Sequence, residues 1–536
     1  MLRTSNLVSM VNKKNLHLLI LAAILLVGFL MRLYRFDSPI ADWHSWRQAD
    51  TSAVSRNFVE HGYDVLHPRF DDLSNIASGK DNPEGYRFVE FPIYNIAQAG
   101  LFQLFGILTL EEWGRLVTIL SSVLSVLFLY LIVSRHSNKT IGLFAAFFQA
   151  FIPYNIYYGR TILPDTSMMM AVLGGIYFFD LYVNVRHPGK RGASASRISN
   201  VGHQRDSGHL PANALPALSN AASSGEHRQL QAGARMTIKN YLFFVFSILF
   251  TAGAFLLKPY AVFFVLPMVV LAYQRWGFKL LLRWELWFFA IVSVGPLVWW
   301  RHWMTQFPEG IPANAWLLNG NGIRFRPSFF RWIGYERIVK LISGYLGSVL
   351  LVLSFFQLKK MKEWAFFTSF LVGSALYVCV FATGNVQHDY YQILIMPTIS
   401  LFCALGSYFL WSSKSPLGKI VLTVCLIGMF YFTWDQVKDY FNINNRSIVV
   451  AGEAVDRLIP KDAKIIANYT GDTSFLYQTK RKGWASFEKD LPEMVKMGAS
   501  YLVLVNPTEQ DLGLGKTYKI ISQMKEYVLF DLKSKL

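Results

Sequence analysis

Residues 114–134 read GRLVTILSSVLSVLFLYLIVS, an apolar run in which Arg115 is the one charged side chain. A helix rises 1.5 Å per residue, so about 20 such residues cross the roughly 30 Å hydrocarbon core of a bilayer. The rest of the chain agrees with this reading, since 53% of its 536 residues are hydrophobic and 16% are charged. Soluble domains contain about 25% charged residues. The sequence therefore predicts a membrane protein.

Apolar runs of similar length recur along the chain. They lie at 15–33, 141–158, 166–185, 241–257, 259–275, 285–304, 337–357, 364–383, 391–411 and 418–434. The first follows two lysines, as in a signal peptide, but no small-residue cleavage site comes after it, so we interpret it as a retained helix. We predict a mainly α, polytopic bundle of about 11 transmembrane helices.

A further stretch, residues 91–108, is apolar but interrupted by Asn95, Gln98 and Gln103. If it lies along the membrane surface and the N-terminus is inside, the lysines and arginines between the spans gather on the cytoplasmic side, as they do in most membrane proteins. If it crosses, those basic residues move outside. We therefore predict an interfacial helix within a first outer loop at 34–112. The net charge of +18 is then explained by the lysines and arginines between the spans, which fix the orientation of the protein in the membrane. No nucleic-acid partner is expected.

Two segments lack apolar runs. Residues 187–238 are rich in Ser, Ala, Gly, Asn and His and carry six Lys and Arg, which predicts a disordered cytoplasmic loop. It either binds anionic lipid headgroups or is a solvated insertion without function. Residues 435–536 have a soluble composition, with two strand-like stretches and two helical ones, and predict a small external α/β domain after a membrane core at 1–434. The three cysteines lie inside apolar runs and indicate no disulfide or metal site.

Ionisable groups at a membrane are costly, which makes them candidates for function. On the predicted outer face, the first loop carries Asp42-Trp-His-Ser-Trp-Arg-Gln-Ala-Asp50. Either aspartate could instead only cap the helix that follows. Arg160-Thr-Ile-Leu-Pro-Asp165 lies between two spans, where Pro-Asp is also a plain signal for a helix start.

Two further groups lie where one apolar run meets the next. Lys258-Pro259 has no other charged residue nearby; the lysine could snorkel to the interface, although on the side where lysine is disfavoured. Gln387-His388-Asp389-Tyr390-Tyr391 joins two spans, and a histidine in such a place is often structural.

The outer loop 305–336 contains Arg324, Arg326 and Arg331, on the face where positive charge is unusual. An anionic ligand would explain them, because the forked guanidinium matches phosphate oxygens. Pairing with the acidic first loop is the alternative. A carboxylate beside basic groups suits the deprotonation of a hydroxyl while a phosphate leaves, and the aromatic residues nearby suit stacking on sugar rings.

With these residues the chain resembles the C-type membrane glycosyltransferases, in particular the group of protein O-mannosyltransferases and lipid A aminoarabinose transferases. The resemblance covers roughly 15–410 and rests on the order and sidedness of several short motifs. These are the acidic first loop, Ser55-Arg56…Gly62, Glu90-Phe-Pro92, Arg160-x-x-x-Pro-Asp165, Lys258-Pro259, and His388-Asp-Tyr-Tyr before a span with Pro397.

The resemblance implies a transferase that takes a sugar from a polyprenyl-phosphate carrier and attaches it, with inversion, to a lipid, glycan or protein acceptor. A first-loop aspartate would be the base. Where the family has this aspartate, the present chain has Arg47, so Asp50 and Asp42 both remain open; we favour Asp50, which lies in the denser motif and is expected to begin a helix. The implied location is a bacterial inner membrane, with the site and the C-terminal domain in the periplasm.

The predicted site follows from these motifs. Its catalytic candidates are Asp50, Asp42 and Asp165, and its substrate-binding candidates are Arg47, Gln48, Glu90, Arg160, Lys258, Arg324, Arg326, Arg331, His388, Tyr390 and Tyr391. No cofactor is indicated, and a divalent metal remains open. Two other functions are considered: a carrier or flippase of a lipid-linked glycan, which needs no base, and a polymerase of such glycans. Internal repeats would favour a transporter, and none are visible.

Overall fold

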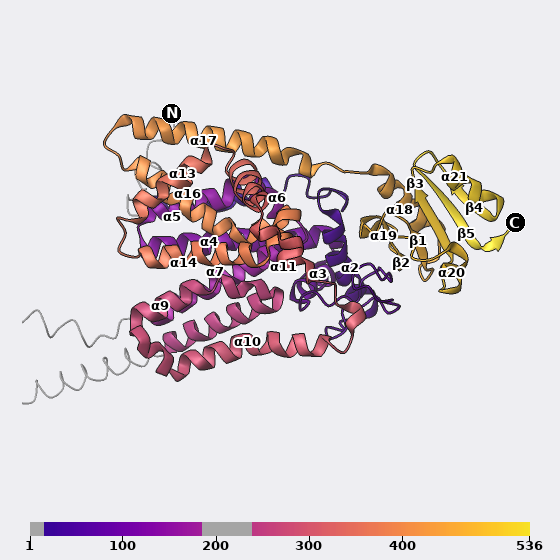
Figure 1. The fold of residues 1–536 in the computed structure, drawn as a ribbon, viewed down its shortest axis with the longest axis horizontal. Coiled ribbons are helices and arrows are strands. Elements are labelled where there is room, and N and C mark those ends of the chain that lie inside the picture. The colour runs from indigo at the N-terminus through magenta and orange to yellow at the C-terminus, as the bar shows by residue number, and fades with distance from the viewer. Residues whose placement is uncertain (1–14, 185–237) are drawn as a thin grey trace, which may run out of the picture.

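The computed structural model describes residues 15–184 and 238–536. The predicted disordered loop at 187–238 falls, except for Ile238, outside these residues. The chain is mainly helical, with a bundle of long helices at one end and a small mixed sheet at the other (Figure 1). The first loop, which holds α2 (Ser45–His61) and α3 (Ile93–Phe105), lies between the two.

Each predicted apolar run is found as one helix or as two or three consecutive helices. These are α1 (Leu16–Arg32), α4 (Leu110–His136), α5 (Lys139–Phe151) with α6 (Pro153–Tyr158), α7 (Pro164–Val183), the Ile238–Leu257 helix, η2 (Pro259–Phe263) with α9 (Leu266–Trp276) and η3 (Gly277–Leu282), α10 (Trp284–Met304), the π-helix η6 (Arg331–Ile342) with α13 (Gly347–Leu358), α14 (Trp364–Val380) with α15 (Ala382–Gln387), η7 (Asp389–Ile395) with α16 (Met396–Trp411), and α17 (Pro416–Val437). Four short helices, η4 (Pro308–Gly310), α11 (Trp316–Asn319), η5 (Gly320–Phe325) and α12 (Pro327–Phe330), connect α10 to η6.

The described residues contain six helices that are long and apolar enough to cross a membrane, or seven if the bent pair Pro327–Ile342 and Gly347–Leu358 is one span. The chain is thus a multi-pass membrane protein. Helices α1, α5 and α14 are apolar but shorter, so the count of about 11 stays a prediction. One predicted run, 141–158, is broken because Pro153 cannot continue the ladder of α5 and begins α6 instead.

Close packing holds the bundle together where a small residue faces a neighbouring backbone. At Gly406 of α16, a Cβ atom would lie 1.9 Å from the carbonyl oxygen of Leu350 in α13. Such approaches drive helix association in lipid, where burial of apolar surface contributes little. A substitution with any larger side chain would separate these two helices.

The first loop is buried although it is polar. Helix α2 begins at Ser45, after His44 in the left-handed conformation, so Asp50 lies in its second turn and does not begin it. Neither aspartate of the motif caps α2, because its N-cap makes no side-chain hydrogen bond. Helix α3 has 13 residues, about 20 Å at 1.5 Å per residue, which is too short to cross a bilayer. The interfacial position predicted for 91–108 stays a prediction.

The C-terminal unit, residues 446–536, is a five-stranded mixed sheet with short helices. The sheet order is β2-β1-β3-β5-β4, parallel among the first three strands and antiparallel among the last three. Its elements are α18 (Arg446–Leu458), β1 (Ile465–Ala467), α19 (Thr473–Gln478), β2 (Gly483–Trp484), α20 (Leu491–Lys496), β3 (Tyr501–Val505), α21 (Glu509–Leu512), η9 (Gly513–Lys516), β4 (Tyr518–Gln523) and β5 (Tyr527–Lys535), after η8 (Lys438–Phe441). The small sheet predicted after the last span is confirmed.

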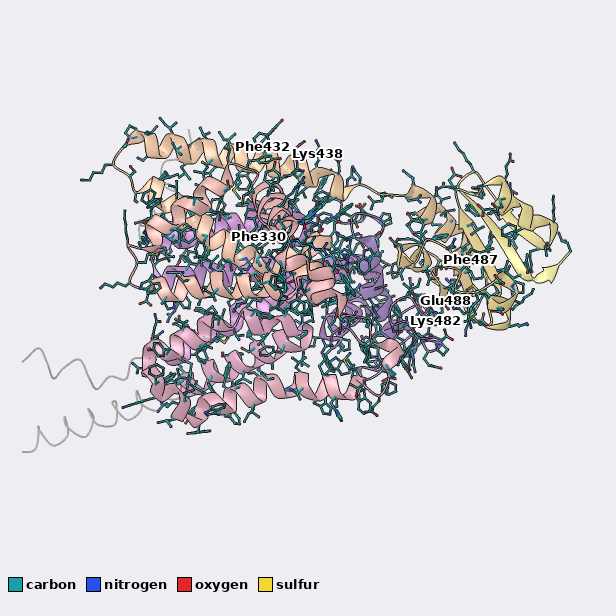
Figure 2. The ribbon with its side chains drawn as sticks, viewed as in Figure 1. Phe330, Phe432, Lys438, Lys482, Phe487 and Glu488 are labelled. Carbon is teal, nitrogen blue, oxygen red and sulfur yellow. The ribbon has the colours of Figure 1, made fainter. Side chains whose placement is uncertain are left out.

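This unit contacts the first loop directly. The backbone N–H of Leu73 donates to the carbonyl of Gly483 at 2.7 Å, and Gly483 N–H donates to the carbonyl of Asp71 at 3.0 Å, so the loop extends the edge of β2. Glu488, labelled in Figure 2 near Lys482 and Phe487, accepts from the backbone N–H of Asn75. The loop and the unit therefore fix each other's position.

Candidate active site

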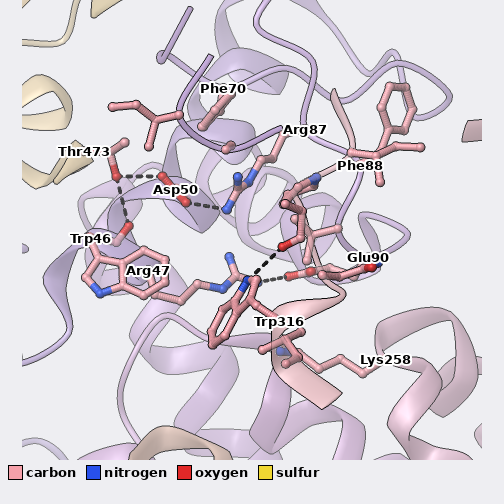
Figure 3. Close-up of a pocket in the computed structure, with 18 of the residues that line it drawn as sticks. Trp46, Arg47, Asp50, Phe70, Arg87, Phe88, Glu90, Lys258, Trp316 and Thr473 are labelled. Atoms are coloured by element: carbon pink, nitrogen blue, oxygen red, sulfur yellow. Dashed lines mark hydrogen bonds and ion pairs between the residues drawn. The ribbon is translucent and has the colours of Figure 1, made fainter. Parts of the chain in front are cut away.

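A cavity of about 590 Å³ opens where the first loop, the bundle and the C-terminal unit meet (Figure 3). Several segments far apart in the sequence form its wall. The lining residues are Trp46, Arg47, Asp50, Phe70, Asp72, Ile76, Ala77, Arg87, Phe88, Val89, Glu90, Lys258, Pro259, Tyr260, Arg301, Ile311, Pro312, Ala313, Asn314, Trp316, Leu317, Leu318, Phe381, Tyr390, Tyr391, Gly471 and Thr473. Of the predicted site residues, the structure thus brings together Arg47, Asp50, Glu90, Lys258, Tyr390 and Tyr391.

Asp50 projects from α2 into this cavity and is only 4% exposed. Arg87 Nη2 lies 2.5 Å from its Oδ2, and the Thr473 hydroxyl donates to its Oδ1 at 2.7 Å (Figure 3). A buried carboxylate needs such partners to stay ionised. Each oxygen keeps a further lone pair, so Asp50 is held in place and can still accept a hydrogen bond from a ligand in the cavity.

Arg47 and Glu90 form the next pair along the cavity. Arg47 lies about one turn before Asp50 on α2, and its Nη2 is 2.7 Å from Glu90 Oε1. Burial alone would raise the pKa of Glu90, but the guanidinium of Arg47 and the Lys258 ammonium lower it overall. Both side chains are therefore charged, and the cation of Arg47 faces the cavity together with its counter-ion.

Lys258 lies at a break between two helices. Its successor, Pro259, ends the Ile238–Leu257 helix, so Lys258 adopts an extended backbone (φ −158°, ψ 132°). Its Nζ is 3.0 Å from Oδ1 of Asp165 in the first turn of α7. Asp165 is fully buried, and neither of its oxygens accepts a well-oriented hydrogen bond from the described residues. The lysine therefore supplies the positive charge that stabilises this carboxylate.

Arg301, near the end of α10, also lines the cavity. Among the described residues it pairs with no carboxylate: its Nη2 donates to the carbonyl of Val89 at a long 3.3 Å, and its Nη1 reaches the sulfur of Met304 at 3.7 Å. Every other cation on this wall has an acidic partner. Arg301 is thus the positive charge most available to an anionic ligand.

Asp72 is a third carboxylate on the wall. Its oxygens accept from the hydroxyl and the backbone N–H of Ser74, at 2.7 and 3.1 Å. Burial raises the pKa of Asp72 to about 6, an effect that the neighbouring Asp50 charge increases. The group therefore changes its charge close to neutral pH.

The other first-loop aspartate lies elsewhere. Asp42 is fully buried and is not part of the cavity wall; Arg160 Nη2 is 2.9 Å from its Oδ2, and Gln48 Nε2 donates to its Oδ1 at 2.7 Å. These three predicted site residues form a closed network that joins the first loop to the α6–α7 connection. The arrangement is typical of a structural ion pair.

The His388–Tyr391 segment is anchored by Asp389. This carboxylate accepts from Trp43, His44, Tyr158 and Tyr440, at distances of 2.5 to 3.3 Å. The anchor directs Tyr390 and Tyr391 into the cavity, whereas His388 stacks on Tyr390 behind the wall. Burial and the neighbouring His44 lower the pKa of His388 to about 4, so its ring is neutral at neutral pH.

The arginine loop does not reach the cavity wall. Arg324 Nη2 donates to the carbonyl of Val380 at 3.0 Å, Arg331 lies 3.7 Å from Glu336, and Arg326 is exposed. The role predicted for these three arginines as a phosphate site stays a prediction. As for a metal, residues 15–184 and 238–536 contain no cluster of three or more His, Cys, Asp or Glu side chains that could hold an ion.

Four cavity residues were missed in the sequence: Asp72, Arg87, Arg301 and Thr473. Arg301 could have been found, because it lies near the tryptophan-rich end of the run 285–304, on the predicted outer face where arginine is unusual. Asp72 and Arg87 lie among many other charges of the first loop, and nothing distinguishes them there. Thr473 reaches the site only through the docking of the C-terminal unit.

Comparisons with known proteins concern the fold and one segment of the chain. Residues 89–191 match the family model described as dolichyl-phosphate-mannose-protein mannosyltransferase. No curated protein matches the sequence. The fold is similar to that of ArnT from Cupriavidus metallidurans in the apo state (12% identity, TM-score 0.62, 97% of this chain and 98% of that one). ArnT bound to undecaprenyl phosphate gives 13% identity, a TM-score of 0.60, and coverage of 96% and 98%.

A third similar structure is the Archaeoglobus fulgidus oligosaccharyltransferase in the apo form, with 10% identity, a TM-score of 0.53, and coverage of 94% of this chain and 70% of that one. At such identities the structural likeness concerns the fold. Together with the family segment, it confirms the predicted resemblance to C-type membrane glycosyltransferases and the predicted class of enzyme.

Proposed function

Because the chain has the fold and a family segment of the C-type membrane glycosyltransferases, we propose that it transfers a sugar from a polyprenyl-phosphate carrier to an acceptor within the cavity described above. The acceptor is a lipid, a glycan or a protein. The proposed setting is a bacterial inner membrane, with the cavity and the C-terminal unit on the periplasmic side. One solved ArnT structure holds undecaprenyl phosphate, which supports a carrier of this chemical class.

Asp50 is the proposed base. It takes the proton from the acceptor's hydroxyl or amine, and the freed electron pair forms the new bond to the anomeric carbon. The bond from that carbon to the phosphate oxygen breaks, and polyprenyl phosphate leaves with the electron pair. Attack from the face opposite the leaving group inverts the anomeric configuration. A base in this role contributes about 10²–10⁴-fold to the rate.

The cations of the wall are proposed to stabilise the leaving phosphate. Arg301 has no acidic partner among the described residues, and Arg47 and Lys258 each offer hydrogen-bond donors in addition to those that face their own carboxylates. Positive groups fixed before the reaction act where negative charge develops, at little cost in reorganisation. Trp316, Tyr390 and Tyr391 provide aromatic surfaces for the sugar ring. None of these steps is assigned to a metal ion.

The observation that carries this proposal is the position of Asp50. It is the aspartate of the predicted motif on the cavity wall, facing the cations, whereas Asp42 pairs with Arg160 outside the wall. Asp165 lies behind Lys258 and is proposed to orient the lysine.

The test is a transfer assay with the purified full-length protein in lipid nanodiscs. A panel of polyprenyl-phosphate sugars identifies the carrier, and release of polyprenyl phosphate measures turnover. Asp50→Asn keeps the shape but takes up no proton, so the folded fraction should lose at least 100-fold in turnover and keep its carrier binding. It also leaves Arg87 without its counter-ion, so its unfolding temperature should fall. Asp42→Asn should lower the unfolding temperature because it leaves Arg160 without its counter-ion, and the folded fraction should keep its turnover. Normal turnover in Asp50→Asn would disprove the assignment of the base.

A further inference from the structure

The proposed base has one partner from outside the membrane part of the chain. Thr473 is the first residue of α19, in the C-terminal unit, and lies 423 positions after Asp50. Its hydroxyl donates to Asp50 Oδ1 at 2.7 Å and also lies 3.2 Å from the carbonyl oxygen of Trp46, one turn earlier on α2 (Figure 3). Thr473 and Gly471 form part of the cavity wall.

The position of Thr473 is fixed by the contacts of α19 with α2. The guanidinium of Arg56 lies over the ring of Tyr477, 4.1 Å from its centroid, and its Nη1 donates to the Tyr477 carbonyl at 3.1 Å. The Tyr477 hydroxyl donates to Ser52 at 2.9 Å. Gln478 Nε2 donates to the carbonyl of Ile40 at 2.9 Å. These buried contacts determine where α19 begins.

We propose that Thr473 is a positioning residue for the reaction, and that the C-terminal unit thereby takes part in catalysis. The inference rests on the proposed function of Asp50. Arg87 holds one oxygen of the carboxylate through an ion pair, and Thr473 holds the other. With both oxygens held, rotation of the carboxylate is restricted, and its position on the cavity wall is fixed. The C-terminal unit thus orients the base toward the acceptor.

The contact also influences proton affinity. A hydrogen bond donated to a carboxylate favours its charged form and lowers its pKa. Loss of the Thr473 hydroxyl should therefore weaken the preference for the charged form of the base and move the acidic limb of the turnover profile to higher pH. A purely structural threonine would not affect this limb.

The experiment compares Thr473→Val, which keeps the shape and removes the hydroxyl, with Thr473→Ser, which keeps the hydroxyl. Both are made in the full-length protein and measured for turnover, KM of the sugar carrier, pH profile and thermal unfolding. The control is Thr470→Val in the same loop, whose exposed hydroxyl reaches only the carbonyl of Tyr469. A hydrogen bond to a charged group contributes enough that its loss should lower kcat about 10-fold.

We expect Thr473→Val to lower kcat, to leave the KM of the carrier unchanged and to shift the acidic limb upward, whereas Thr473→Ser and Thr470→Val behave as the natural protein. An unchanged kcat and pH profile in Thr473→Val, while Asp50→Asn is inactive, would overturn the inference and leave the proposed function intact. Failure of Thr473→Ser to restore activity would also overturn it, because packing would then be the cause. If Asp50→Asn is active, the proposed function itself fails.

Discussion

Replacement of Arg301 with glutamine tests where the phosphate of the sugar carrier binds. Within the described residues, Arg301 has no acidic partner, so its charge is not already neutralised. A hydrogen bond to a charged group contributes about 1.5–3 kcal/mol, and 1.36 kcal/mol corresponds to a factor of ten. Arg301→Gln should therefore weaken the binding of polyprenyl phosphate roughly 10- to 150-fold. In Arg301→Gln no carboxylate loses its counter-ion, so thermal stability should not change.

The same reasoning predicts a different result for Lys258. Lys258→Met removes the counter-ion of Asp165, which is fully buried and paired at 3.0 Å. Removal of one partner of a buried pair costs about 3–5 kcal/mol. This variant should thus lose stability as well as affinity, and the double variant with Asp165→Asn should regain stability without regaining affinity.

The assay is equilibrium binding of undecaprenyl phosphate to the purified protein in nanodiscs, followed by native mass spectrometry, with thermal unfolding of the same samples. Arg326→Gln is the matched control, since Arg326 is exposed and lies outside the cavity wall. Unchanged affinity in Arg301→Gln would refute the placement of the phosphate. A loss in Arg326→Gln instead would move the phosphate to the arginine loop that the sequence analysis favoured.

Two other predictions concern Asp72 and the topology. The pKa of Asp72 is raised above the ordinary value of 3.8 to about 6, so the folded state binds its proton more tightly than the unfolded state, and ionisation of Asp72 lowers stability as pH rises from about 4 to 6. Asp72→Asn should therefore raise the unfolding temperature at pH 7.5 and have no effect at pH 4. An equal change in unfolding temperature at both pH values would show that ionisation of Asp72 is not its cause. For the topology, reporters fused at Asn138 and Asn444 should report opposite sides of the membrane, and the same side for both would disprove the orientation.

The long-range parts of the site show where sequence reasoning succeeds and where it ends. Lys258 and Asp165 were each selected because a charge at a span end is costly, and the structure explains both at once, since each neutralises the other. A charged residue at the end of an apolar run can be recognised from the sequence alone, even when the residue that pairs with it is not known. The same argument identified Asp42 and Arg160, which are also paired, but outside the cavity. Burial cost thus finds charged pairs and does not distinguish a structural pair from a functional one.

Helix starts were harder to predict than helices. The sequence placed a helix in the first loop, yet α2 begins five residues before Asp50, because His44 adopts a left-handed conformation and no side chain caps the first turn. The alternative role of these aspartates as helix caps is not seen, because Asp50 pairs with Arg87 and Asp42 pairs with Arg160. Tertiary ion pairs outweighed a local capping bond of about 1 kcal/mol.

The resulting charge arrangement favours transfer over mere transport. Arg47, Arg87 and Lys258 are each paired with a carboxylate, at 2.5 to 3.0 Å, so the wall is rigid, and its donors are fixed before any ligand enters. A carrier must release its lipid-linked cargo and gains nothing from a carboxylate fixed among cations. A transferase needs this combination, because a proton must leave one reactant while negative charge develops on the other. The placement of Asp50 between Arg87 and Thr473 therefore fits the role of base that we propose for it.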